Sequence, residues 1–186
     1  HMLPKRKWYR RPFDIVTGKA IFYFVLYLLM AIYMYTAVTK WFGLPNLGDY
    51  WVFLRFIIPY ILACIFMAMV LSVLVYRRED CIMLFVFLSV PLLFMSGISW
   101  PGSEIPAFWK WVSWLFPSTF GMNGYLRIMG NGASIADVRH EYIGLWCQVA
   151  VYATLACVMY GLRLKAIVKR LSSAEARMRI YQEKTT

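Results

Sequence analysis

Acidic residues are scarce in this chain, which has nine Asp and Glu against twenty Lys and Arg in 186 residues. None of the nine lies in the four longest apolar stretches of the sequence. Carboxylates inside a membrane are typical of proton relays, so their absence from these stretches argues against an ion-driven transporter. If the chain moves a substrate, we expect the energy to come from another polypeptide.

Catalytic and metal-binding motifs are missing as well. The sequence contains no H-E-x-x-H, G-x-S-x-G or G-x-x-x-x-G-K-[ST] pattern. Its four cysteines lie in or beside apolar stretches without C-x-x-C spacing, which favours small apolar fillers over metal ligands. His140 and Glu141 form the only adjacent acid–base pair, and we interpret it as a surface polar pair. We expect no catalytic residue, no metal site and no cofactor bound by this chain.

Apolar residues dominate what remains. The chain is 61% hydrophobic with a mean hydropathy of +0.58, whereas soluble domains are about 45–50% apolar. A transmembrane helix needs about 20 predominantly apolar residues. Four stretches meet this requirement, at about 20–39, 51–76, 81–98 and 144–162. The sequence therefore predicts an all-α membrane protein with four transmembrane helices in a domain of residues 20–163.

The basic residues are distributed asymmetrically around these spans. Six precede the first span, two lie between the second and third, and seven follow the fourth, so fifteen of twenty share one side if the spans alternate. The positive-inside rule then places both termini in the cytoplasm, as for a multi-pass protein of the inner (cytoplasmic) membrane. Residues 164–186 read as a basic amphipathic tail on that face. The net charge of the chain is +11. The distribution of its basic residues favours a lipid bilayer as the binding partner and argues against nucleic acid.

The segment before the first span consists of a basic arm and a short helical pattern, together residues 1–19. Pro12 suits the first turn of a helix, where its missing N–H costs nothing. Phe13, Val16 and Ala20 then share one face at three- and four-residue spacing. This pattern indicates an interfacial helix leading into the membrane, and a solvated basic flank is the alternative.

The stretch between the third and fourth spans is apolar but interrupted. Residues 107–116, "AFWKWVSWLF", would form a helix of about 15 Å, half of the roughly 30 Å hydrocarbon core. Such a segment must turn back, and its backbone is tolerated only where protein or a wet cavity satisfies its polar groups. The sequence therefore predicts an outer re-entrant helical hairpin between spans three and four, at about 100–130.

The order of these features resembles the C-terminal portion of type 2 ABC exporter permeases. The likeness is carried by "PFDIVTGK" at residues 12–19, by "SGISWPGSEIPAFWKWVSWLFPSTFGMNGYLRIMGNG" at 96–132, and by a closing span with a basic end. Permeases of this family usually have six spans, and the four predicted here correspond to the last four. The resemblance thus implies either a fragment of a longer permease or a subunit whose remaining spans are in another chain.

The resemblance implies a non-catalytic permease subunit that forms the translocation pathway of an ATP-driven exporter. Its implied partners are a separate ABC ATPase subunit, which would bind and hydrolyse the ATP, and a second permease copy in a homo- or heterodimer. The implied ATPase-coupling residues are Pro12, Phe13, Asp14, Val16, Gly18 and Lys19. The implied residues of the outer re-entrant gate are Gly97, Trp100, Pro101, Glu104, Pro106, Trp109, Trp114, Pro117 and Arg127.

A second hypothesis comes from a different class of protein. A membrane enzyme or scaffold acting on anionic lipid or cell-wall intermediates could bind an acidic head group through Arg55, Arg127 or His140. Arg55 falls about one turn inside the second predicted span, where a charge is a functional hypothesis by default. Snorkelling of its guanidinium to the lipid head groups is the favoured interpretation.

Overall fold

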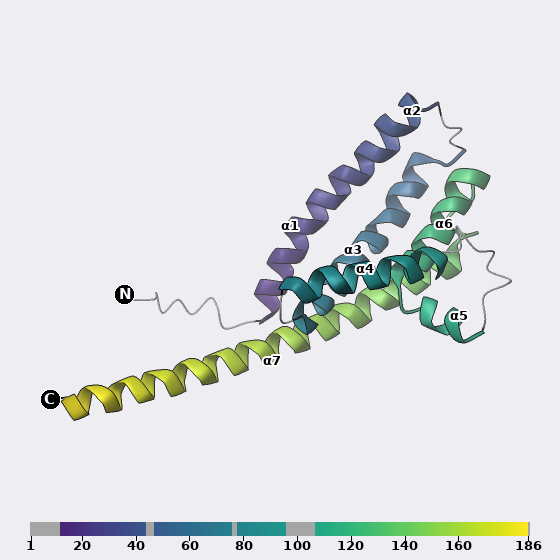
Figure 1. Cartoon of the computed structure of the whole chain (residues 1–186). Helices are drawn as coiled ribbons and strands as arrows, with labels where there is room; N and C mark the ends of the chain where they lie inside the picture. Colours follow the sequence, from purple (N-terminus) through teal and green to yellow (C-terminus); the bar gives the residue numbers. More distant parts are fainter. Residues whose placement is uncertain (1–11, 44–46, 76–77, 96–106, 186) are drawn as a thin grey trace.

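A computed structural model of the chain describes residues 12–43, 47–75, 78–95 and 107–185 (Figure 1). Within these ranges the regular structure is entirely helical. The elements are α1 (Pro12–Tyr33), a π-helical segment (Met34–Val38), α2 (Thr39–Trp41), α3 (Tyr50–Leu74), α4 (Arg78–Met95), α5 (Ala107–Ser113), α6 (Pro117–Asn131) and α7 (Arg139–Thr185). The all-α prediction is therefore confirmed for the described part of the chain.

Among the described residues, three helical stretches are long and apolar enough to cross a membrane, namely Val16–Trp41, Tyr50–Val73 and Arg139–Arg163. They correspond to the predicted spans at 20–39, 51–76 and 144–162. The first stretch runs through α1, the π-helical segment and α2 without a break in the helix. A single π-helical turn inside an α-helix absorbs one extra residue without ending the hydrogen-bonded backbone.

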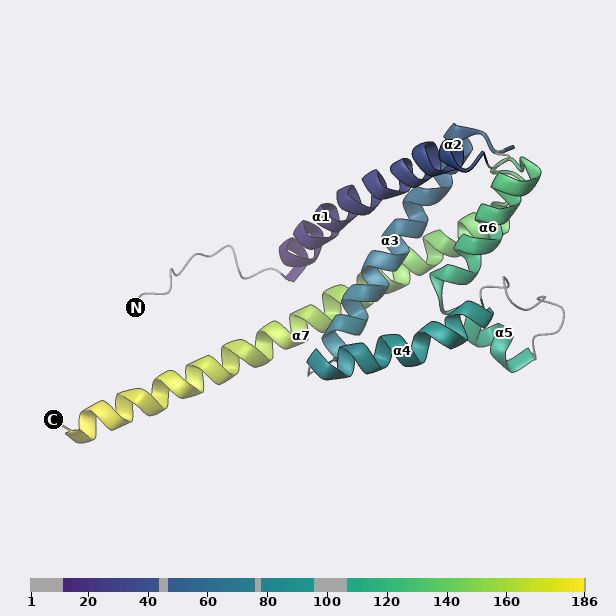
Figure 2. The same ribbon diagram turned by 45° about the horizontal axis from the view of Figure 1, so that its top comes forward.

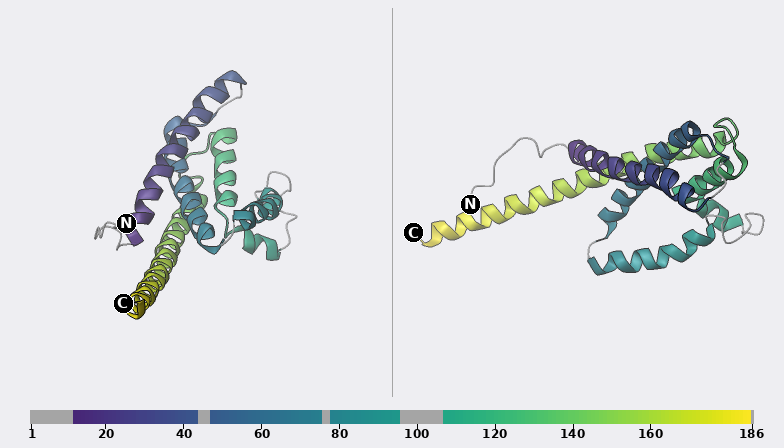
Figure 3. Two further views of the ribbon diagram at one scale, coloured as in Figure 1. Left: turned by 60° about the vertical axis from the view of Figure 1, so that its left-hand side comes forward. Right: turned by 90° about the horizontal axis from the view of Figure 1, so that it is seen from above.

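The third predicted span, at 81–98, is not confirmed. Residues 81–95 belong to α4, and residues 96–98 lie outside the described ranges. The apolar part of α4 in the described chain is the shorter stretch Ile82–Pro91, preceded by the charged Glu79 and Asp80. Figures 2 and 3 show α4 lying apart from α1. Several large apolar side chains of α4 are exposed. The side chain of Phe87, for example, is 76% exposed.

The core is built around α3 and α7, the pair of helices in most extensive contact. One cluster joins α1 to both of them and comprises Val16, Ala20, Ile61, Ile65, Met69 and Ala156. A second cluster joins α6 to both and comprises Phe56, Ala63, Ile128, Val138 and Leu145. Because lipid tails are as apolar as leucine, helices in a membrane associate through close packing, which small residues permit. The fully buried Ala63 and Ala156 meet that requirement.

The last helix is much longer than a span. α7 continues as a helix through the predicted tail at 164–186 as far as Thr185 and leads away from the other helices (Figure 1). Where it leaves them, the Arg163 guanidinium donates a hydrogen bond to the Val73 carbonyl at the end of α3. Basic side chains commonly bind the unpaired carbonyls at a helix C-terminus. The amphipathic character of the tail stays a prediction.

Candidate functional site

The segment predicted to contact an ATPase forms the first turns of α1 and is continuous with the first span. Val16 is 2% exposed and packs, with Ala20, against α3 and α7. Phe13 is 64% exposed, and Asp14, Gly18 and Lys19 are exposed as well. One face of this segment is therefore fixed to the helix bundle, and the other face is uncovered.

The predicted outer gate is described only in its second half. Gly97, Trp100, Pro101, Glu104 and Pro106 lie outside the described residues. The remaining four members are found on α5, on α6 and in the connection between them: Trp109, Trp114, Pro117 and Arg127. Trp109 and Trp114 are about half exposed, whereas Pro117 is buried at the first position of α6.

Two glycines allow α6 to lie directly on α3. A Cβ atom built on Gly121 would lie 2.2 Å from the Tyr60 ring, and one built on Gly124 would lie 2.2 Å from the Phe56 ring. Further along, the backbone N–H of Leu47 donates to the Met129 carbonyl at 3.3 Å. α6 therefore runs alongside α3, beginning near Tyr60 and ending near the loop that precedes α3.

At the break between α5 and α6, side chains donate hydrogen bonds to backbone carbonyls. Gln148 Nε2 donates to the Trp114 carbonyl at 2.7 Å, and the Tyr152 hydroxyl donates to the Leu115 carbonyl. Thr119 Oγ1 donates to the Ser113 carbonyl at 2.9 Å. Gln148 and Tyr152 are four residues apart on α7 and so share one face of that helix.

An ion pair joins the far end of α6 to the start of α7. Arg127 Nη1 lies 2.9 Å from Glu141 Oε1, and the Glu141 side chain is only 14% exposed. Just before α7, the Asp137 carboxylate accepts hydrogen bonds from the backbone N–H and the hydroxyl of Ser134, at 2.9 and 2.7 Å. These two hydrogen bonds favour the ionised form and lower the pKa of Asp137. The turn between α6 and α7 is thus held by charge-assisted bonds.

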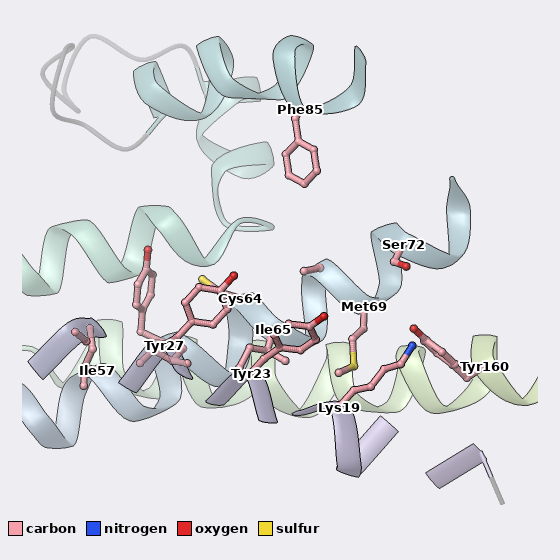
Figure 4. A pocket seen from close by; sticks show the side chains of 14 residues that line it. Lys19, Tyr23, Tyr27, Ile57, Cys64, Ile65, Met69, Ser72, Phe85 and Tyr160 are labelled. Atoms are coloured by element: carbon pink, nitrogen blue, oxygen red, sulfur yellow. The ribbon is translucent and has the colours of Figure 1, made fainter. Parts of the chain in front are cut away.

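A cavity of about 680 Å³ lies between α1, α3 and α7 (Figure 4). Tyrosines from three helices line this cavity. Lys19, one of the residues predicted to couple to an ATPase, lines it as well. The Lys19 ammonium lies 5.3 Å from the centre of the Tyr160 ring, within the range of a cation–π contact. Phe85 reaches towards the cavity from α4 on the opposite side (Figure 4).

The residues of the head-group hypothesis do not form one site. Arg127 is already paired with Glu141, while Arg55 on α3 and His140 on α7 are exposed. Over the described ranges, no group of three or more His, Cys, Asp or Glu side chains could hold a metal ion. Cys64, Cys147 and Cys157 are free thiols.

Sequence reasoning missed the polar residues that hold the α5–α6 break. Gln148 and Thr154 are the polar residues other than tyrosine in the predicted span 144–162, and an amide in an apolar span indicates a buried hydrogen bond. A buried hydrogen bond of Gln148 was therefore predictable from the sequence. Its acceptor was not predictable, because the Trp114 carbonyl lies 34 residues from Gln148 in the chain, and the Leu115 carbonyl lies 37 residues from Tyr152.

The described part of the chain has three membrane-length apolar helices around a buried core, together with a broken helix pair packed on them. This arrangement defines a multi-span integral membrane protein of the all-α class. Residues 10–158 match the family model described as ABC-2 family transporter protein, and the chain belongs to this family. The permease resemblance inferred from the sequence is confirmed at the level of the family.

A plant protein shows a more local likeness. The chain is similar to ABC transporter G family member 52 of Oryza sativa subsp. japonica, with 33% identity over an alignment of 86 residues, and the match covers 38% of this chain and 6% of the relative. The chain thus matches a small part of that relative's length. No solved structure matches the chain.

Proposed function

We propose that this chain is the pathway-forming permease subunit of an ATP-driven ABC exporter in the cytoplasmic membrane, with both termini in the cytoplasm. A separate ATPase subunit binds and hydrolyses the ATP, and a second permease copy, identical or different, completes the pathway. Membership of the ABC-2 transporter family supports a transporter permease rather than an enzyme. The single observation that carries the mechanism is the α5–α6 break and its hydrogen bonds to α7.

In this proposal α5 and α6 form a re-entrant gate at the outer end of the pathway. Tyr60, beside the start of α6, is ten residues into α3, and Gln148 is nine residues into α7. At about 1.5 Å per residue, these positions lie about 15 and 14 Å from the outer ends of their helices. Both depths are close to half of the roughly 30 Å hydrocarbon core.

The hydrogen bonds at the break explain how a turn at this depth is tolerated. Lipid offers no donor to a free carbonyl, so irregular backbone in the membrane must be buried in protein or face water. Gln148 and Tyr152 provide the donors to the Trp114 and Leu115 carbonyls. We further propose that α4 is the third of four spans and precedes the gate in the chain.

The start of α1 is the proposed contact for the ATPase. The exposed Phe13 and Asp14 face away from the core, whereas Val16 and Ala20 are packed against α3 and α7. Because α1 continues as an unbroken helix into the first span, a push on Phe13 would tilt that span rather than bend a loop. An ATPase docked here could therefore move the bundle.

The test is co-purification of the native subunit, in mild detergent, with the ATPase encoded beside it. We expect Phe13→Ala to weaken ATPase binding by about tenfold, since an aromatic anchor at an interface typically contributes more than 1 kcal/mol. Phe22→Ala is the matched control, because Phe22 is 67% exposed on the same helix but lies within the apolar stretch. An intact subunit that purifies without any ATPase would contradict the coupling proposal.

A further inference from the structure

The cavity between α1, α3 and α7 has one charged end and an apolar body. Its lining extends along α1 from Lys19 to Ala31, twelve residues or about 18 Å of helix. That length is close to the thickness of one leaflet, half of the roughly 30 Å core. Isoleucines 57, 61 and 65 of α3 form much of the wall. The volume of about 680 Å³ lies within the range of small-molecule pockets.

Positive charge gathers at one end of this cavity. Lys19 is the fourth residue of the apolar stretch Val16–Trp41, so its ammonium can reach the level of the lipid head groups. The ring of Tyr160 holds it at the cavity end (Figure 4). Arg163 lies one turn further along α7 and binds the Val73 carbonyl next to the lining residue Ser72. Asp14, five residues before Lys19, lies about 140° away around α1.

We propose that this cavity binds one anionic membrane lipid, with its phosphate at Lys19 and an acyl chain along the isoleucine wall. The argument rests on the charge at the mouth, on the leaflet-length apolar body, and on Lys19 lying where head groups lie. It does not depend on coupling to an ATPase. The hydroxyls of Tyr23 and Tyr160 add donors close to the head group.

Photo-crosslinking in lipid nanodiscs tests the proposal without ATP or an ATPase. The chain is reconstituted in phosphatidylcholine with a trace of either diazirine-labelled phosphatidylglycerol or diazirine-labelled phosphatidylcholine, and the crosslinked peptides are identified by mass spectrometry. We expect the anionic probe to label α1 and α3 peptides of the cavity. Lys19→Gln should lower this labelling about fivefold, the effect of one basic residue at a membrane surface, and Lys19→Arg should preserve it.

Two controls separate this site from general attraction to a basic protein. Lys40→Gln removes the lysine near the other end of the same apolar stretch and should leave the labelling unchanged. Ala68→Trp places a large side chain at an exposed position that lines the cavity and should reduce labelling there. Met30→Trp, at an exposed position outside the cavity lining, should have no effect.

Three results would overturn the proposal. Equal labelling of the cavity by the anionic and zwitterionic probes would show that the cavity does not prefer an anionic lipid over a zwitterionic one. If Lys19→Gln left the labelling by the anionic probe unchanged, the phosphate of the lipid would not bind at Lys19. Capture of a diazirine-labelled fatty acid in preference to phosphatidylglycerol would assign the cavity to a free amphipathic acid rather than to a bilayer lipid.

Discussion

Replacing Gly124 by alanine is expected to lower the free energy of unfolding by about 1–3 kcal/mol, the usual effect of overpacking a well-filled interior. The new Cβ atom would lie 2.2 Å from Cζ of Phe56. Phe56 is only 1% exposed, so its ring has no free space to enter, and α6 would have to move off α3. The change is measured as the thermal unfolding midpoint of the purified protein, followed by tryptophan fluorescence.

Gly130 on the same helix provides the matched control. A Cβ atom built there meets nothing within 4 Å, and glycine is about 1 kcal/mol less favourable than alanine inside a helix. Gly130→Ala should therefore leave the midpoint unchanged or raise it. Gly121→Ala should behave like Gly124→Ala, because its Cβ atom would lie 2.2 Å from the Tyr60 ring. Equal midpoints for the alanine variants at 124 and 130 would refute the close α3–α6 contact.

The spans were predictable because their signal is local. A run of about 20 apolar residues marks a membrane helix wherever it packs, and the predicted spans at 20–39, 51–76 and 144–162 agree with structural stretches that begin or end a few residues away. The stretch at 81–98 shows the limit of this signal. Its described residues form α4, which the apolar run predicts as a helix, but hydropathy does not tell how that helix packs.

The packing of α5 and α6 was only partly predictable. The prolines and the short apolar run predicted a re-entrant helical hairpin at about 100–130. The described part of this region contains two short helices, α5 and α6, and their re-entrant path stays a prediction. The glycines that seat α6 on α3 look in the sequence like ordinary turn formers, because their function depends on the rings of Phe56 and Tyr60 in a distant helix. The Arg127–Glu141 ion pair likewise joins residues 14 apart through a reversal of the chain.

Gln148→Leu is expected to loosen the α5–α6 break. The substitution keeps the side-chain volume roughly constant but leaves the Trp114 carbonyl without the 2.7 Å hydrogen bond. A buried carbonyl that loses its donor costs about 1–3 kcal/mol, and interhelical hydrogen bonds in membranes tend towards the lower end. Leucine also removes Gln148 Oε1, a buried oxygen without a hydrogen-bond partner in the described chain, which offsets part of that cost.

The expected result is a rise of up to about fivefold in the labelling rate of a cysteine introduced at Val112 of α5, since about 1 kcal/mol corresponds to a factor of about five. Labelling uses a membrane-impermeant maleimide on a variant whose native cysteines are replaced. Thr154→Val is the matched control, because the Thr154 hydroxyl donates to the Ala150 and Val151 carbonyls within α7 itself. Equal rates for the two variants would show that Gln148 does not hold the break closed.

Gln148→Glu separates the donor function of this side chain from its shape. Glutamate has nearly the shape of glutamine, and at a position that is only 8% exposed burial favours its protonated form. The protonated carboxyl can donate to the Trp114 carbonyl, whereas the ionised carboxylate cannot. If the donated hydrogen bond closes the gate, Gln148→Glu should label like the wild type at low pH and open as the pH rises, with each rate compared with the wild type at the same pH. Gln148→Leu should be open at both pH values, whereas a side chain that acts only by filling space would leave Gln148→Leu closed.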